Sequence, residues 1–116
     1  MTDILPDLLR QGLRLVICGS AAGAVSARQR VYYGHRQNRF WPTLAATGLT
    51  PRLLVPAEYP LLPDYGIGLT DITKTQFGAD AVLTVHDAPR LRDTLLRYRP
   101  EILAFNGKRA ASLGLG

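Results

Sequence analysis

Three short apolar segments, separated by long connections, constrain this chain more than any other feature of its sequence. They lie at 13–18, 66–72 and 101–106, and each is followed by glycine or polar residues. Such runs are typical of strands covered on both faces of a parallel sheet. Between them, residues 38–47 and 87–99 space their apolar side chains as helices do, with start and stop signals. This alternation predicts an α/β domain with a mainly parallel central sheet.

The connections are predicted as loops. Prolines at 51, 56, 60 and 63 make residues 51–65 mostly loop, and 74–80 reads as irregular. Residues 107–111 begin another helix. A chain of 116 residues forms one core, so we expect a single domain over 1–116.

Composition excludes several classes of protein. The chain is 47% hydrophobic and 20% charged, with no apolar run long enough for a membrane helix. Its N-terminus lacks the features of a secretion signal, so we expect a cytoplasmic protein. The single cysteine, Cys18, excludes an internal disulfide, and its place in an apolar run predicts a packed thiol. The net charge of +5, carried mostly by arginine, favours a polyanion as partner.

The first loop, CGSAAGAVSA at 18–27, consists almost entirely of small residues. It matches neither a dinucleotide-binding fingerprint nor a P-loop, which leaves a tight turn or a ligand cradle. The carboxyl ends of parallel strands meet at one edge of the sheet, where ligands bind. We therefore expect this loop, the Thr70–Asp71 segment and the residues after Phe105 to converge.

A basic segment follows at 28–39, RQRVYYGHRQNR, which has no acidic residue and two adjacent tyrosines. Arginines interleaved with aromatic rings suit unstacked nucleic acid, because arginine binds phosphate and the rings stack on bases. A solvated basic loop is the alternative.

Together, CGSAAGAVSA, YYGHRQNRFWPTL, AATGLTPRLL, YGIGLTDI and RYRPEILAFNGKRAA resemble the mismatch-specific uracil/thymine DNA glycosylase family over about 13–111. The resemblance implies a three-layer α/β/α sandwich of the uracil-DNA glycosylase type and a monomer that acts on double-stranded DNA. It implies removal of uracil, or a related base, from mismatches by hydrolysis of the N-glycosidic bond. Neither a metal nor a cofactor is implied, and the base is rotated out of the duplex.

The resemblance also implies roles for individual residues. Tyr33 falls where the family stacks an aromatic ring on the base, with Tyr32 as the alternative ring. The remaining base-binding positions are Gly19, Ser20, Ala21, Gly23 and Asn38, and the DNA-binding candidates are Arg28, Arg30, Arg36, Arg39 and Lys74.

Two departures from the family pattern bear on activity. Ala21 stands where the family commonly has an asparagine that positions the attacking water. Asp71, at the end of a predicted strand, is our catalytic candidate, because a carboxylate orients water and stabilises positive charge on the sugar. A capping role for Asp71 is the equal alternative. Lys74 is expected to contact phosphate or to pair with Asp71.

The second departure lies at the end of the chain. The family continues after this point with a strand and a loop that enters the minor groove, so we expect a C-terminally truncated member. A catalytically silent nucleic-acid-binding fragment of the same fold is therefore the alternative function, and a nucleotide-binding α/β domain is the third.

Overall fold

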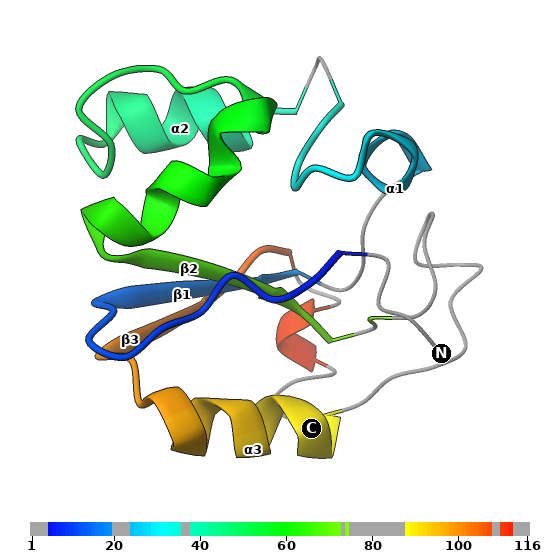
Figure 1. Cartoon of the computed structure of the whole chain (residues 1–116), viewed down its shortest axis with the longest axis vertical. Helices are drawn as coiled ribbons and strands as arrows, with labels where there is room; N and C mark the ends of the chain where they lie inside the picture. Colours follow the sequence, from blue (N-terminus) through cyan, green and yellow to red (C-terminus); the bar gives the residue numbers. More distant parts are fainter. Residues whose placement is uncertain are drawn as a thin grey trace.

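A computed structural model describes residues 5–19, 24–35, 38–72, 74, 88–107 and 110–112 of the chain (Figure 1). The elements are the strands β1 (Leu15–Gly19), β2 (Ile67–Asp71) and β3 (Ile102–Phe105), the helices α1 (Ala24–Gln29), α2 (Phe40–Ala46) and α3 (Ala88–Tyr98), and the 3₁₀ helix η1 (Pro56–Tyr65).

The described strands form a parallel sheet, as the sequence predicts, and their order is β2-β1-β3. The register aligns Gly19 of β1 with Asp71 of β2, and Cys18 of β1 with Phe105 of β3. Two main-chain bonds extend the pairing past the strand ends, from Asn106 N–H to Cys18 O and from Ile72 N–H to Gly19 O. The loops that follow the three strands therefore leave from one edge of the sheet.

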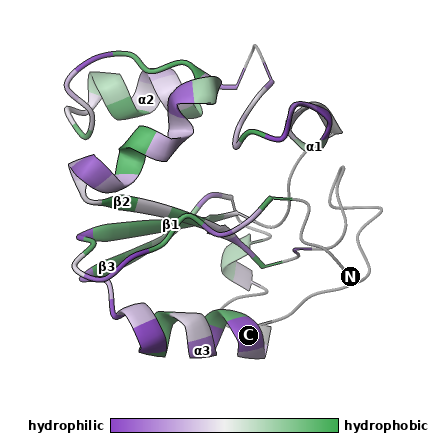
Figure 2. Ribbon diagram, viewed as in Figure 1, coloured by the Kyte–Doolittle hydropathy of each residue, from purple (hydrophilic) through white to green (hydrophobic). Residues whose placement is uncertain are grey.

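The sheet is the middle layer of three, because each of its faces carries a separate core. On one face Ile17 and Leu69 pack with Phe40 of α2 and Leu62 of η1. On the other face Cys18 packs with residues of α3 and with Ala110. Figure 1 shows α2 and η1 on one side of the sheet and α3 on the other, and Figure 2 shows apolar residues concentrated in the strands between them. This confirms the α/β sandwich.

The prediction that residues 51–65 are mostly loop is wrong, because most of this segment forms η1. Proline fixes φ near the value that a 3₁₀ turn needs, so prolines support a short helix of this kind. Glu58 holds the start of η1 by accepting the Val55 N–H at 3.1 Å. Gly66 ends η1 in the left-handed conformation, with φ of +80°. The helix α1 was also not predicted, since its six residues are too few for a periodic pattern.

The N-terminal segment before β1 lies beside β2 through an antiparallel bridge between Leu8 and Leu69. Their main chains exchange two N–H···O bonds of 2.9 Å each. Gly68 permits this approach, since a Cβ there would lie 2.8 Å from the Leu8 carbonyl oxygen. The bridge brings Asp7 to the carboxyl end of β2.

In the described part of the chain, no helix has the length and apolarity needed to span a bilayer.

Candidate active site

Gly19, Tyr33 and Asp71 meet at the carboxyl edge of the sheet. A Cβ placed on Gly19 would lie 2.8 Å from Asp71 Oδ1 and 3.4 Å from the Tyr33 hydroxyl. Only a residue without a side chain leaves the Asp71 carboxylate in its present position beside β1. Three of the predicted site residues, distant in sequence, thus form one cluster.

Asp71 is a buried carboxylic acid, 4% exposed. Its burial raises the pKa from 3.8 to about 6, and the like charge of Asp7 adds to the rise, whereas the positive charges of Lys74 and Arg90 oppose it. The group is therefore mostly ionised at neutral pH but remains a much better base than an exposed aspartate. A pKa near the working pH is the property that a general base requires.

A network of two cations and a second carboxylate surrounds Asp71. The Lys74 ammonium lies 2.9 Å from Asp7 Oδ1 and 4.0 Å from Asp71 Oδ2. The Arg90 guanidinium, from α3, donates to Asp7 Oδ2 at 3.1 Å and to the main-chain oxygen of Asp71. Thr70 donates its hydroxyl to Asp7 Oδ1 at 2.6 Å. Through these contacts the N-terminal segment, Lys74 and α3 together hold the end of β2 in place.

Tyr32 joins the same network and Tyr33 does not. The Tyr32 hydroxyl accepts from Lys74 at 3.1 Å and donates to the Pro6 carbonyl at 3.0 Å, and its ring is buried. Tyr33 instead places its hydroxyl beside Gly19. Of the two rings that the sequence offered for base stacking, Tyr33 is the one at the first loop.

Tyr33 is held by its neighbours in an unusual backbone conformation. Its φ is +52°, which few non-glycine residues adopt and which is found preferentially at functional sites. One face of its ring stacks on Phe40 with centroids 3.8 Å apart, and its carbonyl accepts the Trp41 indole N–H at 3.1 Å. Burial and the nearby charge of Asp71 raise the pKa of the Tyr33 hydroxyl, so it stays protonated, while Asn106 opposes the rise.

Asn38 starts the helix that carries Phe40 and Trp41. Its Oδ1 accepts the Phe40 N–H at 2.8 Å, so it satisfies the first backbone donor of α2 in the way that capping side chains do. The cap orients the first turn of α2 so that Phe40 and Trp41 both face the core. Asn38 therefore positions the ring that supports Tyr33.

The predicted DNA-binding residues fall into three groups. Arg28, Arg30 and Arg39 are exposed, which leaves their guanidinium groups accessible to a phosphate backbone. Lys74 was expected either to contact phosphate or to pair with Asp71, and the structure shows the pairing: its side chain is 4% exposed and lies 2.9 Å from Asp7 Oδ1 and 4.0 Å from Asp71 Oδ2. Arg36 lies outside the described residues, as do the predicted base-binding positions Ser20, Ala21 and Gly23.

Cys18 is a packed thiol, as predicted. It is fully buried in β1, and burial raises its pKa to about 12, so the thiol is not a nucleophile at neutral pH. Among the described residues, no group of three His, Cys, Asp or Glu side chains is gathered as a metal site would require.

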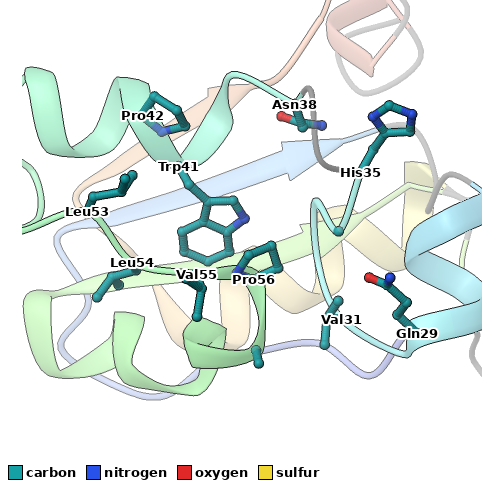
Figure 3. A pocket seen from close by; sticks show the side chains of 12 residues that line it. Gln29, Val31, His35, Asn38, Trp41, Pro42, Leu53, Leu54, Val55 and Pro56 are labelled. Atoms are coloured by element: carbon teal, nitrogen blue, oxygen red, sulfur yellow. The ribbon is translucent and has the colours of Figure 1, made fainter.

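A cleft of about 900 Å³ lies between the basic segment, the start of α2 and residues 53–57, which lead into η1. Figure 3 shows Trp41 and Pro42 from α2 and Val55 and Pro56 from the opposite wall, with Gln29, His35 and Asn38 at the other end. Neither Tyr33 nor Asp71 lines this cleft. It is therefore separate from the cluster at the edge of the sheet.

Sequence reasoning missed Asp7 and Arg90 as parts of the site. Both contact the carboxyl end of β2, although they lie 64 residues before and 19 residues after Asp71. No local pattern marks either residue. Only the bridge of the N-terminal segment to β2 and the packing of α3 under the sheet bring them together.

A comparison with protein-family models agrees with this arrangement. Residues 6–116 match the model described as the uracil DNA glycosylase superfamily. The match covers every strand and helix of the described structure, including β1, β2 and the segment that carries Tyr33. The chain therefore belongs to the uracil DNA glycosylase superfamily.

Proposed function

We propose that this chain is a DNA glycosylase that removes uracil from mismatched double-stranded DNA, with Asp71 as its catalytic base. The observation that carries the proposal is the position of Asp71, a buried carboxylate with a raised pKa beside Gly19 and Tyr33. Ala21 has no side chain able to orient water. Asp71 supplies the missing polar group from the neighbouring strand.

The reaction follows from the chemistry of the bond. The extruded base lies against Tyr33 beside Gly19, and the Tyr33 ring is supported by its stacking on Phe40. The bond from the sugar C1′ to the base breaks, and its electron pair leaves with the base. Asp71 stabilises the positive charge that develops on the sugar and takes a proton from water as the oxygen bonds to C1′. The products are the free base, after protonation, and an abasic site.

DNA binding is assigned to the basic segment. Arg28, Arg30 and Arg39 expose their side chains on and beside α1 and α2. Arginine contacts with phosphates position a duplex without reading its sequence. Specificity for the mismatch then comes from the base that leaves the stack most easily.

The test measures abasic-site formation under single-turnover conditions in a duplex with one uracil opposite guanine. Matched duplexes carry uracil opposite adenine and thymine opposite guanine. We expect uracil to be released fastest from the duplex in which it stands opposite guanine. Asp71→Ala should lower that rate by about 10²–10⁴-fold and leave the affinity for DNA unchanged. Asp64→Asn, which removes an exposed carboxylate paired with Arg10, is the control and keeps the wild-type rate.

Two outcomes contradict the proposal. Equal rates for wild-type protein and Asp71→Ala would remove Asp71 from the mechanism. Tight, salt-dependent duplex binding with no abasic product from any of the three duplexes would favour the catalytically silent binding protein.

A further inference from the structure

The charges around Asp71 are distributed unequally between the two carboxylates. Lys74 Nζ is 2.9 Å from Asp7 Oδ1 but 4.0 Å from Asp71 Oδ2. Arg90 places one guanidinium nitrogen 3.1 Å from Asp7 Oδ2, whereas the other bonds to the main-chain oxygen of Asp71 and not to its carboxylate. Both cations thus make their close ionic contact with Asp7.

The two carboxylates also differ in what holds them. Asp7 accepts hydrogen bonds on both oxygens, from Thr70 and from Arg90, in addition to its ion pair with Lys74. Asp71 turns Oδ2 toward Lys74, while Oδ1 faces Gly19. Of the two oxygens of Asp71, Oδ1 is therefore the one that lies beside the end of β1.

We propose that Asp7 is a positioning residue that binds Lys74 and Arg90 and thereby keeps both cations from forming close ion pairs with the Asp71 carboxylate. The inference rests on the proposed catalytic role of Asp71. A close ion pair stabilises the ionised form of a carboxylate and makes it a weaker base. Without the negative charge of Asp7, the Lys74 ammonium has Asp71 as its remaining anionic partner among the described residues and is expected to move toward it.

The groups that face Asp71 come from every element packed against it. Asp7 belongs to the N-terminal segment, Lys74 follows β2 and Arg90 lies on α3. Among the described residues, the neutral groups in electrostatic contact with Asp71 are Cys18 in β1 and the tyrosines Tyr32 and Tyr33. Burial raises the pKa of each of these three groups, so none changes charge between pH 5 and 8. Of the described residues that face it, Asp71 therefore responds over that range to the two cations and to Asp7.

This account predicts opposite effects for two substitutions in one network. Asp7→Asn removes a charge that favours the protonated form of Asp71, so the acidic limb of the pH–rate profile moves to lower pH by roughly one unit. Lys74→Gln removes a charge that favours the ionised form, so the limb moves to higher pH by a similar amount. A purely structural role would lower the rate in both variants without moving the two limbs in opposite directions.

The experiment measures single-turnover uracil release between pH 4.5 and 8 for the full chain and for both variants. A titration of the Asp71 carboxyl carbon by NMR, without DNA, gives the same quantity independently of catalysis. Asp7→Glu keeps the charge and is expected to restore the wild-type limb. Asp64→Asn makes the same chemical change at an exposed ion pair and is expected to leave the limb unmoved.

Asp7→Asn decides the question by itself, and if it does not fold, the NMR midpoint of Asp71 in Asp7→Ser is measured in its place. An unmoved limb, or a shift in the wrong direction, overturns the inference. If the wild-type chain releases no uracil, the proposed function fails, while the NMR titration still tests the effect of Asp7 on Asp71. If uracil is released but the NMR midpoints do not move as stated, the role of Asp7 fails and the proposed function stands.

Discussion

Gly19→Ala tests whether the close approach of β1 to Asp71 matters for catalysis. The new methyl group would lie 2.8 Å from Asp71 Oδ1, whereas ordinary van der Waals contact begins at 3.4 Å. The oxygen must therefore retreat by about 0.6 Å. Its freedom to do so is small, because the residue is buried and Oδ2 already faces Lys74.

The size of the effect follows from this displacement. A misplacement of about 1 Å at a reacting group costs on the order of 10²-fold in rate, so about 0.6 Å predicts a loss of roughly 10- to 100-fold. Overpacking of the site costs about 1–3 kcal/mol of unfolding free energy. The variant is thus expected to fold and to lose most of its activity.

The assay is single-turnover release of uracil per folded molecule, with the unfolding free energy measured in urea. Gly48→Ala is the matched control. Gly48 has a φ of +78° and open space around its Cα, so alanine there strains the backbone by about 1–2 kcal/mol without touching the site. A wild-type rate for Gly19→Ala, with Gly48→Ala equally active, would refute the argument that this glycine makes room for the carboxylate.

Three further outcomes are expected. Trp41→Phe removes the indole donor to the Tyr33 carbonyl and lowers the unfolding free energy by about 1 kcal/mol in urea, and an unchanged free energy would mean that this bond does not hold Tyr33. Arg28→Gln with Arg39→Gln reduces the slope of log affinity against log salt by about 0.9 for each phosphate that the variant no longer neutralises, and an unchanged slope would place the duplex elsewhere. Asp71 has a raised pKa, so the stability that it contributes is present below pH 4 and is lost as the pH rises through 6. Thermal melts at pH 8 should therefore show Asp71→Asn to be more stable than wild type by up to about 3 kcal/mol. A less stable variant would contradict the raised pKa.

The parallel sheet and its active edge could be predicted because their signals are local. Each buried strand is a short apolar run, and the order of strands and helices limits how they connect. Gly19 and Asp71 each end such a run, so a parallel arrangement of the strands is enough to predict that they lie close together.

The helices α1 and η1 escaped prediction because they carry no periodic signal. Prolines at 56, 60 and 63 read as loop markers, yet proline dihedrals also fit the 3₁₀ conformation that η1 adopts. The choice between the two is made by tertiary contacts, such as the burial of Leu62 against the face of the sheet that α2 also covers. Propensity alone does not contain that information.

The network around Asp71 was beyond sequence reasoning for a different reason. Asp7, Lys74 and Arg90 come from separate parts of the chain, and ion pairs between them depend on where three elements pack. The sequence placed Lys74 near Asp71 through their spacing of three residues, but not in the core. In the structure the Lys74 side chain is buried, so it pairs with carboxylates and does not reach a phosphate.

The most direct test of the central claim, that Asp71 acts as an ionised general base, is the pH dependence of uracil release by the wild-type chain. Measured under single-turnover conditions with saturating enzyme, the rate should fall below a midpoint near pH 6, by about tenfold per unit, and be level from pH 7 to 8. A rate that is unchanged from pH 5 to 8 would contradict the account.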